Sequence, residues 1–96
     1  MAELIIWIQY LYSDDTIGDP EYDYSLLDFA GILPSIGDQI LHPDVLAGHT
    51  RSAPGNRVML TVAGRVFNPR DRRNCISLLC ESRTVTEDEV SLLPPG

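Results

Sequence analysis

The fold is decided by the stretch Arg57-Val-Met-Leu-Thr-Val-Ala-Gly-Arg-Val-Phe67, which is followed after a polar segment by Cys75-Ile-Ser-Leu-Leu-Cys-Glu-Ser-Arg83. Apolar side chains recur at every second position of both stretches, as in β-strands with one buried face. The apolar rows are Val58, Leu60, Val62 and Val66, with Arg57, Thr61 and Arg65 between them, and then Ile76, Leu78 and Cys80. Two such strands joined by the polar loop Asn68 to Asn74 predict an antiparallel hairpin.

Glycine and cysteine positions add detail to this hairpin. Gly64 interrupts the apolar row of the first strand, which indicates a β-bulge or a close approach of another chain segment. Cys75 and Cys80 are an odd number of positions apart in the second strand, so they point to opposite faces at a separation of about 16 Å. We therefore expect two reduced, packed thiols rather than a disulfide or a metal-binding pair.

Working outward, the N-terminal segment Leu4 to Tyr12 is rich in β-branched and aromatic residues at both even and odd positions. This pattern predicts a strand covered on both faces, either central in a sheet or half covered by a neighbouring element or subunit. Ser13 to Tyr24 then changes to Asp, Gly and Pro with interspersed tyrosines, which predicts a long acidic loop.

The middle of the chain is less regular. Residues 25–33 fit one face of a short helix but also tolerate an extended conformation, and we favour a strand or irregular segment. Pro34 to Asp38 predicts a turn that leads into a short strand at Gln39 to His42. A second long loop is expected over residues 43–56, which hold two prolines and two glycines.

Near the C-terminus, Thr84 with Glu87 and Thr86 with Glu89 both have capping-box spacing, which predicts one or two helical turns before Pro94. In total the pattern predicts four or five strands. We expect one mainly β domain over residues 1–96, folded as a small antiparallel barrel or curved sheet with a short C-terminal helix and with long loops at 13–24 and 43–56.

A resemblance to a known group of proteins rests on the segment Pro34-Ser-Ile-Gly-Asp-Gln-Ile40 and on the strand that ends at Arg65-Val-Phe67. It resembles a P-x-[IV]-G-D-x-[IV] layout found in short, uncharacterised bacterial and phage proteins that look like small SH3-like barrels. The resemblance covers about half of the chain. It implies a small β-barrel and carries no activity with it.

Charge is unevenly distributed along the chain. Residues 1–48 contain nine acids and no base, whereas residues 49–96 contain five acids and seven bases, all of them arginine. The two halves therefore carry −9 and +2, which sum to the net charge of −7. A pI near 4.5 argues against direct nucleic-acid binding, because nucleic-acid-binding domains usually present a basic field.

Several chemical classes have no support in the sequence. The acids at 14–23 match no register of a calcium-binding EF-hand loop, His42 and His49 lack a third metal ligand nearby, and no phosphate-binding glycine motif occurs. We expect no metal, no cofactor and no enzyme activity, and we expect both histidines to have structural roles. Only a pocket that brings one histidine together with Cys75 or Cys80 would support an enzyme.

No apolar run approaches the roughly 20 residues of a membrane span. The longest candidate, Leu4 to Ile8, follows an acid rather than a basic region, which argues against a secretory signal. The expected location is cytoplasmic.

Exposed tyrosines among carboxylates are typical of surfaces that grip basic proteins. Our leading hypothesis is a non-enzymatic protein-binding module whose acidic loop docks on a basic partner, and in its sharper form a phage or mobile-element inhibitor that mimics nucleic acid. The alternative is a homo-oligomeric phage or assembly protein, in which the arginine-bearing hairpin of one copy meets the acidic loop of another. The candidate partner-binding residues are Asp14, Asp15, Asp19, Glu21, Tyr22, Asp23, Tyr24, Asp28, Arg70, Arg72 and Arg73.

Overall fold

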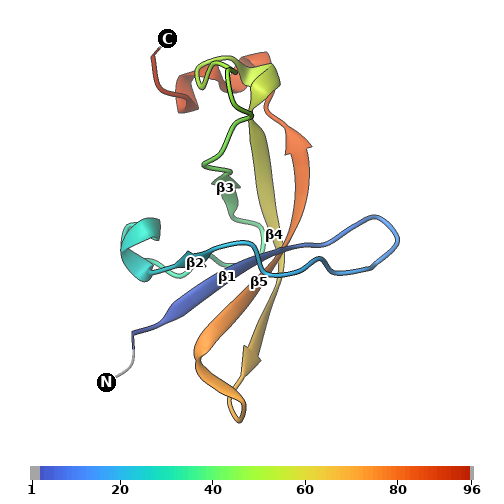
Figure 1. Ribbon diagram of the computed structural model, residues 1–96, viewed down its shortest axis with the longest axis vertical. Helices are drawn as coiled ribbons and strands as arrows, with labels where there is room; N and C mark the ends of the chain where they lie inside the picture. Colours follow the sequence, from blue (N-terminus) through green and yellow to red (C-terminus); the bar gives the residue numbers. More distant parts are fainter. Residues whose placement is uncertain (1–2, 96) are drawn as a thin grey trace.

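The computed structural model describes residues 3–95 of the chain. Its strands are β1 (Ile5–Tyr10), β2 (Asp23–Tyr24), β3 (Gln39–Leu41), β4 (Val58–Asn68) and β5 (Arg72–Thr84), and its 3-10 helices are η1 (Leu26–Phe29), η2 (Pro54–Asn56) and η3 (Glu87–Leu92). The strands form one sheet in the order β2-β1-β5-β4-β3, which curls into a half-barrel (Figure 1). The prediction of a mainly β fold with four to five strands is confirmed.

The predicted hairpin forms as β4 and β5, which pair antiparallel from Val58 opposite Thr84. The expected bulge is present, because the register shifts between Val62 and Gly64. One boundary was wrong: β5 begins at Arg72, so much of the predicted loop 68–74 is strand. The hairpin extends beyond the core there, and both of its faces are exposed, so polar side chains do not mark the end of a strand.

The N-terminal strand β1 forms as predicted, but its neighbour could not be read from the sequence. β1 runs parallel to β5, with Ile6 opposite Ile76 and Ile8 opposite Leu78, so the sheet is mixed rather than wholly antiparallel. On its other side β1 pairs antiparallel with the two-residue strand β2. The edges of the half-barrel are therefore β2 and β3.

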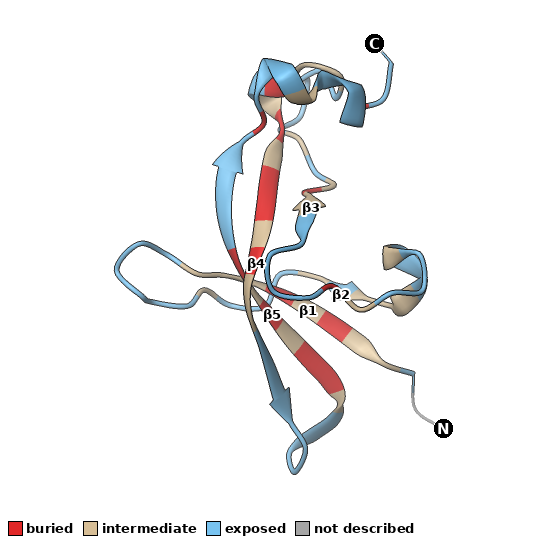
Figure 2. Ribbon diagram, turned by 180° about the vertical axis from the view of Figure 1, so that it is seen from behind, coloured by how far each residue is buried: buried red, intermediate tan, exposed pale blue. Residues whose placement is uncertain are grey.

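The main core lies on one face of this sheet, where β1, β4 and β5 cross (Figure 2). Ile6, Leu60 and Leu78 are completely buried there. The opposite face of β1 is only half covered: Trp7 is partly exposed and lies under the guanidinium of Arg72, 4.7 Å from the ring centre. On one face of the predicted strand Ile6 and Ile8 are therefore buried, and the other face is only partly covered.

Both long loops contain more structure than the sequence indicated. Ser13 to Tyr24 was predicted as loop to its end, but its last two residues form β2. Residues 25–33 were expected to be extended or irregular, yet Leu26–Phe29 form η1, because the side chain of Asp28 accepts a hydrogen bond from the Ser25 amide and caps the turn. Residues 43–56 end in η2.

The chemistry of the two cysteines agrees with the prediction. Cys75 and Cys80 both lie in β5, both are free thiols and both are buried. Burial raises the pKa of Cys80 to about 11, so the thiol stays protonated and unreactive at neutral pH. In the described part of the chain, no helix has the length and apolar character needed to cross a membrane.

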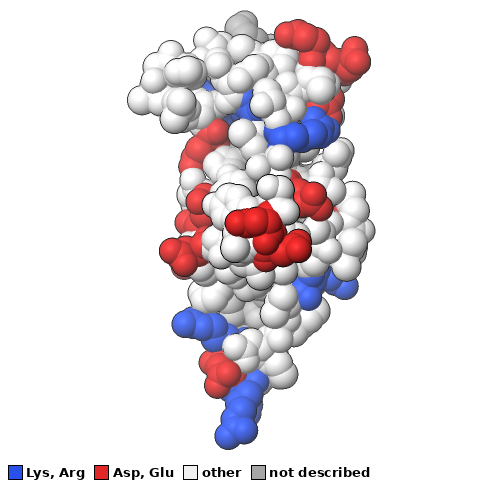
Figure 3. All heavy atoms as spheres, turned by 90° about the vertical axis from the view of Figure 1, so that its right-hand side faces the viewer, with Lys and Arg blue, Asp and Glu red and all other residues white. Residues whose placement is uncertain are grey.

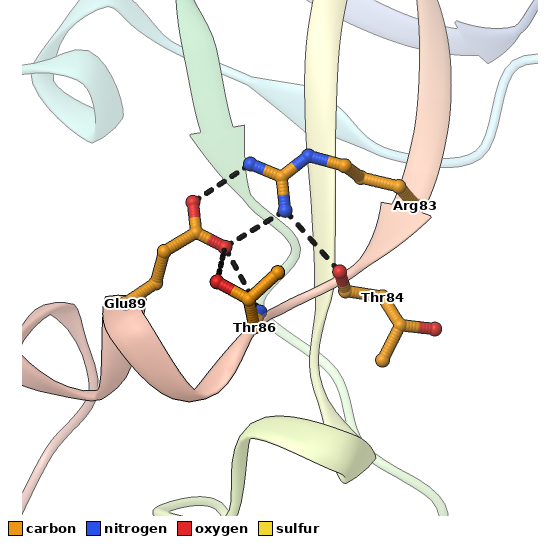
Figure 4. A network of polar contacts seen from close by, with 4 residues as sticks. All are labelled: Arg83, Thr84, Thr86 and Glu89. Atoms are coloured by element: carbon orange, nitrogen blue, oxygen red, sulfur yellow. Dashed lines mark hydrogen bonds and ion pairs between the residues drawn. The ribbon is translucent and has the colours of Figure 1, made fainter.

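The C-terminal turn η3 is stabilised by a predicted capping box and by an ion pair (Figure 4). The carboxylate of Glu89 accepts a hydrogen bond from the Thr86 amide at 2.9 Å. Both terminal nitrogens of Arg83 also donate to this carboxylate, each at 2.7 Å. The bonds from Arg83, and next those from Thr86, lower the pKa of Glu89 to about 2.

This network predicts a pH dependence of stability. The pKa of Glu89 is depressed in the folded state from 4.5 to about 2, so its contribution is present above about pH 4.5 and is lost as the pH falls towards 2. Glu89→Gln should reduce the free energy of unfolding at neutral pH, and the difference from wild type should vanish near pH 2. Chemical denaturation across this range measures it. Glu87→Gln, which removes the same charge from η3 but keeps the ion pair, is the control; equal effects of both variants would contradict the prediction.

Candidate binding site

A row of aromatic rings runs between the two edges of the half-barrel. Neighbouring rings lie 5.4 to 6.3 Å apart between centres, within the range of favourable aromatic contacts. We call this set the aromatic row; in spatial order its members are Tyr12, Tyr10, His42, Tyr22, Tyr24 and Phe29.

Segments far apart in the sequence bring these rings together. Tyr10 ends β1 and Tyr24 ends β2, and both pack against the main core. His42 follows β3, and its amide donates to the carbonyl of Val58 at 2.9 Å, which continues the β3–β4 pairing by one residue. The row therefore depends on the curl of the sheet, which brings the end of β3 towards β1 and β2.

Asp44 ties the middle of the row together. Its carboxylate accepts a hydrogen bond from the Tyr22 hydroxyl, and its amide donates to Nδ1 of His42 at 3.1 Å. The bond to Asp44 is the main reason that the pKa of Tyr22 is raised to about 12. Tyr22 therefore stays neutral as a hydrogen-bond donor at physiological pH.

One end of the row forms a pocket of about 440 Å³ in which aromatic rings and carboxylates meet. We call it the acidic pocket; its lining includes Tyr10, Tyr12, Asp19, Glu21 and Tyr22 and contains no basic residue. Backbone hydrogen bonds hold its wall in place, because the amide of Gly18 donates to the carbonyl of Tyr10 and the amide of Glu21 donates to that of Ile8. Desolvation, and secondarily the charge of Glu21, raises the pKa of Tyr10.

The other end of the row forms a pocket of about 580 Å³ between the edge strands, which we call the seam pocket. Both β2 and β3 contribute to its walls, together with η1, and its lining includes Tyr24, Asp28, Phe29, Asp38 and Ile40. The hydroxyl of Tyr24 is buried and has no hydrogen-bond partner among the described residues. The pocket is mainly apolar with carboxylates among its lining residues.

The candidate binding residues that the sequence indicated lie in different parts of the structure. Asp19, Glu21 and Tyr22 line the acidic pocket, while Tyr24 and Asp28 line the seam pocket. Asp14 instead accepts hydrogen bonds from Thr16 within its own loop, and these bonds lower its pKa. Asp15 is an exposed neighbour in the same turn.

The three arginines of the hairpin do not join the acidic loop. Arg70, Arg72 and Arg73 are all exposed, at the far end of β4 and β5 from the core. From the side on which the acidic loop projects, acidic groups gather in the middle of the molecule, and basic groups lie both at its lower end and near its upper end (Figure 3). Asp23 accepts a hydrogen bond from Nε1 of Trp7 at 2.5 Å, and the guanidinium of Arg72 lies over the same indole ring.

Sequence reasoning missed several residues of the site. Tyr10 was assigned to a strand, His42 was expected to be merely structural, and Phe29 fell in an ambiguous segment. The closeness of Asp44 to His42 in the sequence was the available signal, but only the fold shows that Tyr22 completes the group.

The described residues contain no group of three or more His, Cys, Asp or Glu side chains placed to hold a metal ion. His42 and His49 line one pocket, and neither cysteine is among its lining residues. A scan against protein-family models and searches of curated proteins and of solved structures found no match.

Proposed function

We propose that the protein is a non-enzymatic binding module that takes a basic side chain of a partner protein into its acidic pocket. The observation that carries the proposal is the meeting of Tyr10, Tyr12 and Tyr22 with Asp19 and Glu21 in one pocket without a basic residue. Aromatic faces attract cations, and carboxylates pair with them, so arginine or lysine is the side chain that this lining fits best.

The free carboxylates support this assignment. Asp14, Asp23 and Asp28 are each engaged by hydrogen bonds within the protein. Asp19 and Glu21 have no side-chain hydrogen bond to the part of the chain described here, and both are exposed. Their charge is therefore available to a partner, and the excess of acid in residues 1–48 would steer a basic surface towards them.

The test measures binding of a synthetic arginine-rich peptide by calorimetry at physiological ionic strength. The double variant Asp19→Asn with Glu21→Gln keeps the shape of the pocket and removes both charges. We expect its affinity to fall about tenfold or more, because the bound cation loses two carboxylates that meet it together beside the aromatic rings. Ring signals of Tyr10, Tyr12 and Tyr22 should shift on titration of the wild type.

The matched control is Asp14→Asn with Asp15→Asn, which removes the same charge from the same loop outside the pocket. Asparagine also retains the acceptor that caps Thr16. This control should change the affinity by no more than about twofold, as expected for solvent-screened charges. Equal losses in both double variants would mean diffuse attraction and would refute a specific pocket.

The sharper form of the proposal concerns the partner. A basic protein surface that normally holds nucleic-acid phosphates would be occluded by carboxylates presented in their place, which is the inhibitor expected from the sequence. The seam pocket is joined to the acidic pocket through the Tyr22–Tyr24 ring contact and would take an apolar residue of the same partner.

A further inference from the structure

Arg57 is buried at the start of β4 although its place in the alternating pattern predicted exposure. Only 2% of its surface is accessible. One terminal nitrogen donates to the carbonyl of Arg51 at 2.9 Å and the other to that of His42 at 3.0 Å, which ties the 43–56 loop to the sheet. Its Nε–H has no acceptor among the described residues.

This guanidinium lacks a counter-charge. The ion pair found in residues 3–95 joins Arg83 to Glu89, and Arg57 has no carboxylate within ion-pair distance. The charged group that acts on Arg57 is instead Arg51, whose like charge adds to desolvation in lowering its pKa. A buried cation without an anion is costly, and bonds to neutral carbonyls offset only part of that cost.

Arg57 lines a pocket of about 360 Å³, and Tyr10 belongs to the lining of both this pocket and the acidic pocket. Two imidazoles, His42 and His49, share the lining with it. Nδ1 of His42 accepts the amide hydrogen bond from Asp44, so the neutral ring carries its proton on Nε2 and presents a donor there. Asp44 also borders the pocket, but its carboxylate is engaged by the hydroxyl of Tyr22.

We propose that this pocket binds a small molecule through a carboxylate or phosphate group, whose negative charge is the counter-charge that Arg57 lacks and to which Nε2 of His42 donates a further hydrogen bond. Guanidinium groups bind both kinds of oxyanion through charge-assisted hydrogen bonds. The volume fits a small ligand, at the lower end of the range for such sites. The site is distinct from the acidic pocket, whose ligand has the opposite charge.

The test titrates the wild-type protein with inorganic phosphate and, separately, with acetate, each against sodium chloride at matched ionic strength. Ring signals of His42 and His49 should shift and saturate with at least one oxyanion but not with chloride. The melting temperature should rise with the logarithm of the same oxyanion concentration. The arm that responds identifies the group; absence of a saturable shift in both arms overturns the proposal.

Variants locate the site. Arg57→Met should weaken binding about tenfold or more, whereas Arg65→Met, which removes the same charge from an exposed position on β4, should leave it unchanged. Since Arg57 also anchors the loop, circular dichroism checks that the variant is folded, and Arg57→Lys and His49→Ala serve as milder replacements with smaller losses. Wild-type affinity in any folded Arg57 variant would refute the assignment.

Discussion

A chain carrying Ile6→Asp is expected to be unfolded at 25 °C and neutral pH. Ile6 is completely buried in the main core, between β2 and β5. A carboxylate there has no partner, and either its charge or its neutralisation costs several kcal/mol in addition to the lost apolar contacts. The sum approaches the whole stability of a domain of this size, about 5–15 kcal/mol. Far-UV circular dichroism and gel filtration measure the outcome.

The control for this prediction is Ile5→Asp, one residue earlier in β1. Ile5 lies on the opposite face and is only partly buried, so this variant should stay folded with a smaller loss of stability. If Ile5→Asp unfolded the protein and Ile6→Asp did not, the strand would face the other way, because a shift of one residue exchanges the two faces.

Leu78→Ala is expected to lower the free energy of unfolding by about 2–5 kcal/mol. Leu78 is completely buried in β5, opposite Ile8 of β1, so truncation removes contacts and leaves a cavity at the centre of the sheet. Urea denaturation should show a lower midpoint with an unchanged slope.

Leu79→Ala is the matched control for that measurement, since Leu79 is the next residue of β5 and is half-buried on the other face, near Gly64. Its loss should be clearly smaller, about 1 kcal/mol. Equal losses at both positions would contradict the placement of the main core on the face that carries Leu78.

The sequence predicted those parts of the fold whose cause is local. The β4–β5 hairpin follows from alternation in two adjacent segments and from Gly64, and the cap of η3 follows from the spacing of Thr86 and Glu89. The β1 segment was recognised because its residues favour strands. All three depend on interactions within or between neighbouring stretches of chain.

The parts that failed depend on contacts between distant residues. The parallel pairing of β1 with β5 joins residues about 70 positions apart, and no local pattern encodes it. Alternation with Val58 predicted that Arg57 faces solvent. In the structure its guanidinium is covered and donates hydrogen bonds to the carbonyls of Arg51 and His42. The aromatic row is likewise a product of tertiary structure, because His42 reaches Tyr10 and Tyr22 only after the sheet has curled.

The candidate site was predicted in part. Its acidic loop was identified from composition, and Asp19, Glu21 and Tyr22 do meet in one pocket. Composition alone could not separate them from Asp14, whose carboxylate is used by Thr16. Binding of a basic partner by these residues stays a prediction, which the two double variants of the loop test.

The parallel pairing also sets an order of events during synthesis. β1 is the first strand to leave the ribosome, yet its partner on one side is residues 75–80 of β5. Until that segment emerges, Ile6 and Ile8 have only the two-residue strand β2 beside them, which cannot bury them. Completion of the sheet therefore waits until β5 has emerged, and contacts over such separations slow folding. The nascent chain therefore carries β1 as an unpaired apolar strand throughout that interval, and unpaired apolar strands favour aggregation until β5 arrives.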